Sequence, residues 1–355
     1  MTTPQTKKAH QIKINSNSPF FVSICKDKTS LHSYIHLATV QTDGIKVLAA
    51  YGKNKLPRGV KPQSSDCEII FSQTPAVILD EPIMHRDENP RRTQVSYKAF
   101  ENSYQAYLLY IKKLIHLSEE QKKKGINPRY LSAYVPIVPD DKVVLGKDEV
   151  ILERRFLTYA MLKDIQQALD SFDKPIPMDL QKQFNPGYCQ LSQRDTCRTT
   201  AIDMAQDVAM LDNLGKGVSG LFFRRLPLSM TIVNGIIQPE HLFVLPPPPN
   251  AFKDMEPKNL LIAKRLYRRL DEIIQIQKKN PLTQQKFEAI KKLYKETTEN
   301  YACDHSQLMK HIEKWHSDNQ ELLGSHRKAH WFRFQTASTK MFNEILAENK
   351  STRPN

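Results

Sequence analysis

The sequence predicts an α+β protein, with a mixed sheet that carries inserted helices and an all-helical C-terminal region. Two observations predict this class: β-rich runs dominate residues 10–79, and every apolar pattern after residue 251 has helical spacing. Four consecutive prolines, Pro246 to Pro249, separate the two regions. We therefore expect an α/β module over residues 1–245, a proline linker over 246–250 and a helical bundle or cap over 251–355.

The clearest local signal in the first region is a hairpin. Asp43-Gly44 stands between β-rich runs at 34–41 and 45–51, and glycine supplies the positive φ that a tight hairpin turn needs. The other elements expected in the module are strands at 10–15, 19–25, 68–71, 76–79 and 130–138 and helices at 97–117 and 156–172.

The C-terminal region begins with Pro257 at a first-turn position, followed by an apolar stripe to Ile274. Further helices are expected at 281–299, 305–323 and 327–348.

Composition limits the possible classes of function. The 355 residues include no apolar run of the ~20 residues that span a bilayer, and the N-terminus lacks the apolar core of a signal peptide. Five irregularly spaced cysteines predict a reducing compartment rather than a disulfide framework. We expect a cytosolic protein that is not transmembrane, or a bacterial effector secreted without a cleaved signal into a host cell.

The net charge of +14 favours an anionic ligand such as an inositol phosphate or an acidic lipid. Because the charge is spread along the chain and no binding motif accompanies it, nucleic acid is not the expected partner. Cys303, His305, His311 and His316 do not converge on one helix face, so no metal site and no cofactor are predicted.

The candidate catalytic residue is Cys197, at the start of an apolar helical pattern. Ser192 and Asp195 form a capping-box-like pair, which places the cysteine in the first two turns. There the helix dipole and unpaired N–H groups stabilise a thiolate. Gln190 could donate its side-chain amide to an oxyanion.

The base that such a cysteine needs is expected to be His36, on a strand of the Asp-Gly hairpin, with Asn54 at the end of the return strand orienting the imidazole. Structural interpretations stay open: Cys197 as a small buried hydrophobic residue, and His36 as a hydrogen-bonded strand histidine.

A histidine hairpin, a Gln-bearing loop and a Cys-led helix, in this order, resemble the clan of ubiquitin-like-protein proteases and YopJ-type effector acetyltransferases. The cysteine box of that clan matches Gln190, Ser192, Asp195, Cys197 and Ala205. The clan places an acidic residue on the return strand, where this chain has Gly52 to Asn54.

The resemblance implies a thiol hydrolase acting on a protein substrate, ubiquitin or a ubiquitin-like protein. The alternatives are a YopJ-like acyltransferase using acetyl-coenzyme A, or a non-catalytic effector that binds a protein or an anionic membrane through its helical tail and basic faces.

Overall fold

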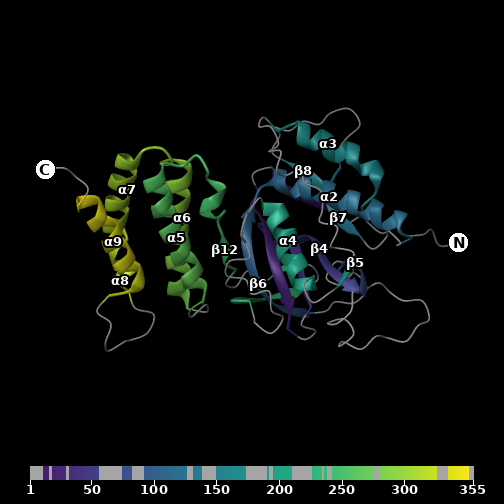
Figure 1. Cartoon of the computed structure of the whole chain (residues 1–355), viewed down its shortest axis with the longest axis horizontal. Coiled ribbons are helices and arrows are strands. Elements are labelled where there is room, and N and C mark those ends of the chain that lie inside the picture. The colour runs from purple at the N-terminus through teal and green to yellow at the C-terminus, as the bar shows by residue number, and fades with distance from the viewer. Residues whose placement is uncertain are drawn as a thin grey trace. The chain divides into compact units, whose positions relative to one another are not determined.

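The computed structural model divides into two compact units, Met1–Glu240 and His241–Asn355, which are described separately. The structure describes residues 11–15, 18–28, 32–55, 74–81, 92–125, 131–137, 149–172, 190–191, 195–209, 226–233, 236–237, 242–275, 280–325 and 335–351 (Figure 1).

The first unit is built on an antiparallel barrel of six strands. The barrel strands are β2 (Phe20–Asp27), β3 (Ser33–Gln41), β4 (Gly44–Lys55), β6 (Arg92–Asn102), β10 (Leu228–Val233) and β11 (Ile236–Ile237). Their order is β11-β10-β6-β2-β3-β4, and β11 pairs with both β10 and β4, which closes the barrel. Two further strands, β5 (Thr74–Asp80) and β9 (Gln190–Leu191), extend the sheet beyond β4.

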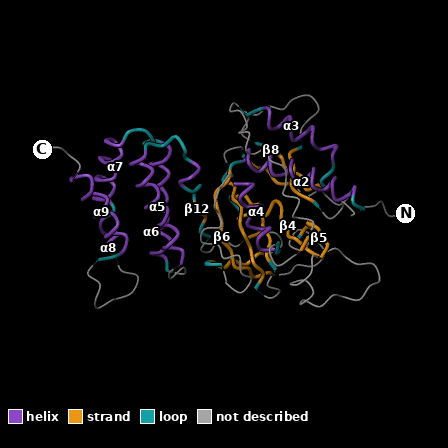
Figure 2. The backbone as a smooth tube through the Cα atoms, in the orientation of Figure 1, coloured by secondary structure: helices purple, strands orange, loops and turns teal. Residues whose placement is uncertain are grey.

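A smaller sheet and three α-helices complete the described part of this unit. The sheet has the order β1-β8-β7, with β1 Gln11–Ile14, β7 Ser132–Pro136 and β8 Val150–Phe156. The helices are α2 (Tyr104–Lys123), α3 (Leu162–Asp170) and α4 (Cys197–Ala209), and a 3₁₀ turn, η3 (Tyr159–Met161), precedes α3. Helix α4 contacts β2, β3, β4 and β6, and it lies against the orange strands in Figure 2.

The expected Asp-Gly hairpin is confirmed. Gly44 has φ +130°, and Gln41 pairs with Gly44 at the end of the β3–β4 ladder. The Lys46 Nζ atom lies 2.7 Å from the Asp43 carboxylate across the turn. Turn chemistry and apolar strands therefore produce the longest hairpin of the barrel locally.

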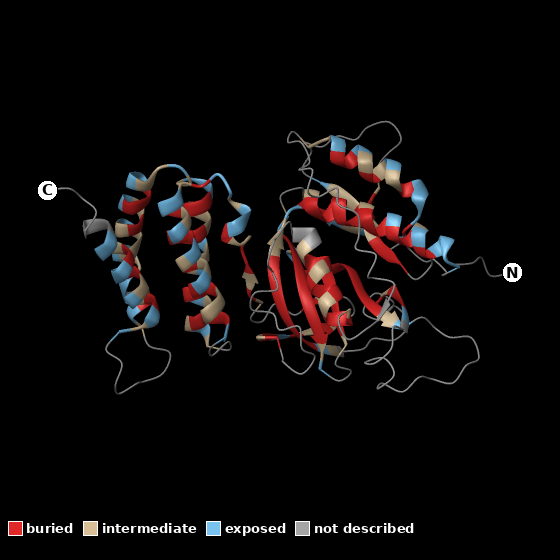
Figure 3. Ribbon diagram, viewed as in Figure 1, coloured by how far each residue is buried: buried red, intermediate tan, exposed pale blue. Residues whose placement is uncertain are grey.

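The second unit consists of helices. Their bounds are α5 Pro257–Gln275, α6 Pro281–Glu299, α7 His305–Asp318, α8 Gln320–Gly324 and α9 Ala337–Ser351, with two short elements before them, β12 Val244–Leu245 and η6 Pro249–Ala251. The apolar stripe expected on α5 is buried from Ala263 to Ile274, as the red inner faces in Figure 3 show, whereas Leu261 at its start is 59% exposed. Phe243 packs edge-on against Phe287 of α6, with ring centroids 5.1 Å apart.

The expected proline linker is a packed part of the helical unit. Pro249 is buried, and the Tyr294 hydroxyl donates a hydrogen bond of 2.6 Å to the Pro247 carbonyl. The division between the units falls after Glu240, before the prolines. An extended proline run can therefore pack against a helix bundle, because its carbonyls make no hydrogen bonds within the run and can accept them from the helices.

The predicted fold class is confirmed, while several elements have other bounds: the helix expected over 156–172 begins at Leu162, and the one expected over 305–323 is divided into α7 and α8. The six barrel strands pair antiparallel, and so do the strands of the β1-β8-β7 sheet. The helix expected over 97–117 begins only at Tyr104, because residues 92–102 pair as β6 with both β2 and β10. The strand expected at 68–71 lies outside the described residues.

Of the described helices, none combines the length and apolarity needed to cross a membrane.

Candidate active site

Cys197 is the first residue of α4, and it is 7% exposed. The helix is capped by Thr196, whose hydroxyl accepts a hydrogen bond of 3.2 Å from the Thr199 N–H. Asp195 is therefore not the capping residue, and Ser192, the other candidate, lies outside the described residues. A cysteine at the first helical position lies at the positive end of the helix dipole. The sequence predicted that Cys197 lies in the first two turns of a helix, and the structure confirms that position.

The histidine that contacts Cys197 is His32, which directly precedes β3. The imidazole of His32 interacts with the side chain of Cys197, and its Nε2 lies 2.8 Å from Oε1 of Glu81. The His32 side chain is 21% exposed and that of Glu81 is 8% exposed. A thiol, an imidazole and a carboxylate therefore form one connected series at the start of α4.

The surroundings of His32 favour its charged form. Burial by itself lowers the pKa of His32, but hydrogen bonds to Cys197 and Glu81 and the negative charges of both partners outweigh burial and raise the pKa to about 10. His32 is therefore an imidazolium at neutral pH. A histidine cation beside a cysteine is an arrangement that stabilises a thiolate.

Gly52 on β4 provides the space that this pair occupies. A Cβ atom at this position would lie 2.1 Å from Oε1 of Glu81 and 2.5 Å from Nε2 of His32. Any larger residue would push the imidazole and the carboxylate away from their present positions. A glycine inside a strand often marks such a close approach, and here the approaching groups belong to the site.

Two buried basic side chains lie beside the cysteine. The Lys53 Nζ atom donates a hydrogen bond of 3.1 Å to the carbonyl of Asp195, two residues before Cys197. Arg198, which follows Cys197, is 1% exposed. The pKa of Arg198 is lowered, because the effect of burial exceeds the opposing effect of the Cys197 charge. Lys53 and Arg198 thus add positive charge at the start of α4, in the same direction as the helix dipole.

His36, the base expected from the sequence, does not occupy this site. Its ring is completely buried, with Nδ1 3.5 Å from Sγ of Cys25 and the ring edge against Phe21. Burial lowers the pKa of His36 to about 3, so the ring is neutral. The physical reason is distance along the chain: His36 lies four residues beyond His32, which is about 13 Å along an extended strand.

The other two expected site residues have different positions. The Asn54 side chain donates a hydrogen bond of 3.2 Å to the Gly52 carbonyl, so it braces the end of β4 instead of orienting the expected imidazole. The backbone of Gln190 pairs with Pro75 of β5, and its side chain lies outside what the structure describes. Its role as an oxyanion donor stays a prediction.

Sequence reasoning missed His32 and Glu81, although each carries a signal. His32 directly precedes the strand that carries His36, so the sequence offers two histidines, four residues apart, as the base. Glu81 directly follows an apolar strand, where a carboxylate at a sheet edge is a common site feature. Gly52, an isolated glycine inside the return strand, was the third signal.

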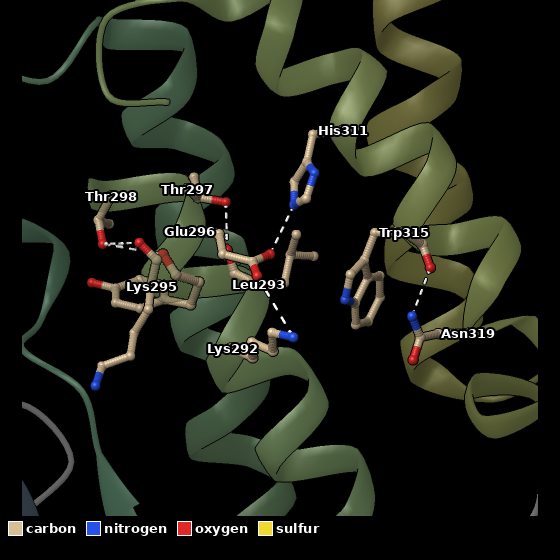
Figure 4. A network of polar contacts seen from close by, with 10 residues as sticks. Lys292, Leu293, Lys295, Glu296, Thr297, Thr298, His311, Trp315 and Asn319 are labelled. Carbon is tan, nitrogen blue, oxygen red and sulfur yellow. Dashed lines mark hydrogen bonds and ion pairs between the residues drawn. The ribbon is translucent and has the colours of Figure 1, made fainter. Parts of the chain in front are cut away.

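The three histidines considered in the helical unit make separate contacts, and Cys303 is exposed. The His305 Nδ1 atom lies 2.7 Å from Oδ1 of Asn259. Figure 4 shows His311 directed at Glu296, with 2.8 Å between Nε2 and Oε2. His316 stacks on Phe342. In the described part of the chain, no group of three or more His, Cys, Asp or Glu residues is arranged to hold a metal ion.

Comparisons of the chain with protein-family models, with curated proteins and with solved structures found no match.

Proposed function

We propose that this protein is a thiol hydrolase in which Cys197 is the nucleophile, His32 the proton-transfer residue and Glu81 the orienting acid. The observation that carries the proposal is the series of interacting side chains from Cys197 through His32 to Glu81. Nucleophile, base and orienting group in this order are the parts of covalent catalysis by cysteine enzymes.

The reaction follows from the charges. The thiolate of Cys197 attacks the substrate carbonyl, and backbone N–H groups at the start of α4 stabilise the oxyanion that forms. The imidazolium of His32 then donates its proton to the departing amine, leaving an acyl-enzyme and a neutral imidazole. Water attacks the thioester, His32 accepts the water proton, and the acid product leaves with the thiolate restored. Glu81 holds the ring in position through both steps.

For the substrate we propose ubiquitin or a ubiquitin-like protein, cleaved at an isopeptide bond. The support is the resemblance of the cysteine segment and hairpin to the ubiquitin-like-protein proteases. Glu81 adds to that support, because it supplies an acidic partner between histidine and cysteine in chain order. We place the action in the cytosol, in a host cell if the protein is an exported bacterial effector, because a resting thiolate persists where thiols stay reduced.

The second candidate is a YopJ-like acyltransferase that uses acetyl-coenzyme A. The net charge of +14 favours it, because coenzyme A and regulatory inositol phosphates are both polyanions. The two reactions share the acyl-enzyme at Cys197 and differ in the donor and the acceptor.

The experiment is the alkylation rate of Cys197 by iodoacetamide from about pH 5 to 9, located by peptide mass spectrometry. The range spans the ordinary thiol midpoint near 8.5. We expect rapid labelling at the acidic end, and a loss of at least about 100-fold in His32→Leu. His36→Leu is the matched control, because it removes the buried histidine of β3 that lies four residues beyond His32, and we expect it to label like the wild type.

Slow labelling with an ordinary thiol midpoint in the wild type would reject the enzyme and favour the non-catalytic binding protein. If the thiolate is present, the acyl donor is identified by the mass added to Cys197. A ubiquitin probe with a C-terminal electrophile tests the protease, and acetyl-coenzyme A tests the acyltransferase.

A further inference from the structure

We infer that Lys53 is a positioning residue of this site, which holds the main chain before Cys197 at the correct distance from His32. The inference rests on the proposed function. It begins from the burial of Lys53, whose side chain is 2% exposed on a strand paired on both sides, with β3 and with β5. A buried ammonium costs free energy unless it is hydrogen-bonded, so such lysines are rare in strands.

The partner of Lys53 gives the reason for its position. Its Nζ donates to the carbonyl of Asp195, which belongs to the turn directly before α4. The contact joins residues 142 positions apart in the chain. Asp195 is separated from Cys197 only by the capping residue Thr196, so fixing its carbonyl fixes the first turn of the helix and the direction of the sulfur.

The same strand also fixes the other half of the site. Gly52, the neighbour of Lys53, provides the space for the pair of His32 and Glu81. The Ala50 carbonyl accepts a hydrogen bond of 3.0 Å from the backbone N–H of Glu81. Residues 50–53 of β4 thus lie against Glu81, His32 and the Asp195 carbonyl that precedes Cys197. Because β4 is paired with a strand on each side, its backbone is rigid and fixes the relative positions of the carboxylate, the imidazole and the turn before Cys197.

The test uses the rate–pH profile of Cys197 alkylation in the full chain. In Lys53→Met, which keeps the volume and removes the donor and the charge, we expect labelling at pH 6 to fall about tenfold and the thiol midpoint to rise. Lys53→Arg restores a cationic donor, and we expect it to recover most of the rate.

The matched control is Lys286→Met in the helical unit. Lys286 is also 2% exposed, and its Nζ donates to the carbonyls of Leu323 and Ser325 at 2.9 and 2.6 Å. We expect this variant to lose stability while the profile of Cys197 stays unchanged. If Lys53→Met does not fold, Lys53→Gln takes its place with the same expectation of slower labelling.

The outcomes separate this inference from the proposed function. A folded Lys53→Met or Lys53→Gln with the wild-type profile overturns the positioning role, while the His32-dependent thiolate stands. Equal losses in Lys53→Arg and Lys53→Met would also overturn it, since only packing would then matter. A wild-type protein without a His32-dependent thiolate rejects the proposed function itself.

Discussion

Gly52 is the residue at which one added carbon has the largest consequence for the site. The position of its missing Cβ is occupied by the His32 imidazole and the Glu81 carboxylate, and both are packed between β3, β4 and the end of β5. A Cβ atom at this position would force one or both groups to shift, and a shift of one alone would lengthen the 2.8 Å contact between them. The geometry of the base therefore depends on the absence of a side chain.

For Gly52→Ala we expect the rate of Cys197 alkylation at pH 6 to fall about 100-fold, since misplacing a catalytic group by an ångström has an effect of that order. The measurement is the same labelling experiment, with circular dichroism to confirm folding. Gly324→Ala is the control, because a Cβ there meets no atom within 4 Å. Wild-type labelling in Gly52→Ala would mean that His32 and Glu81 do not activate the cysteine.

The raised pKa of His32 makes the stability of the first unit depend on pH. A histidine whose pKa in the folded state is about 10, against 6.5 unfolded, contributes stability that is fully present below pH 6.5 and is lost as pH rises toward 10. We expect the free energy of unfolding in urea to fall from pH 7 to 9, with a smaller slope in Glu81→Gln. That substitution removes the charge that helps to raise the pKa of His32. Identical slopes would contradict the His32–Glu81 ion pair.

At the scale of elements, the start of α4 decides where the sulfur lies. Thr196 makes three hydrogen bonds to the first turn of the helix. Its hydroxyl accepts from the Thr199 N–H, and its carbonyl accepts from the Thr199 hydroxyl and the Thr200 N–H. The capping residue thus stands between the carbonyl fixed by Lys53 and the nucleophile. A helix that frayed here would release Cys197 from its place.

For Thr196→Ala we expect a loss of about 1 kcal/mol in the free energy of unfolding, the usual contribution of an N-cap hydroxyl. Thr196→Ser keeps that hydroxyl and should recover most of the loss. Chemical denaturation measures the stability, and iodoacetamide labelling measures the site. An alanine variant as stable as the wild type would show that α4 does not depend on this cap.

At the scale of the molecule, all three groups of the site belong to the first compact unit, Met1–Glu240. The second unit has its own core, in which Phe287 is completely buried against Phe243. The candidate active site therefore belongs to one unit and the helical core to the other. Damage to the helical core is expected to leave the thiol site intact.

For Phe287→Ala we expect a loss of about 3–5 kcal/mol in the stability of the helical unit, because the cavity lies in a closed core. Below the temperature at which that unit unfolds, the alkylation rate of Cys197 should equal that of the wild type. Calorimetry and labelling at one temperature test both parts. A changed labelling rate in the folded variant would mean that the helical unit contributes to the site.

The sequence by itself determined the local features of this protein: the Asp-Gly hairpin, the helical C-terminal region and a cysteine at the start of a helix. Each follows from turn chemistry, apolar periodicity or helix-start residues within a few positions. Only the tertiary structure decided that the histidine beside Cys197 is His32, that the acid is Glu81, and that Lys53 reaches Asp195. The contacts of Glu81 and Lys53 join residues 49 and 142 positions apart, and barrel closure and strand register set such distances.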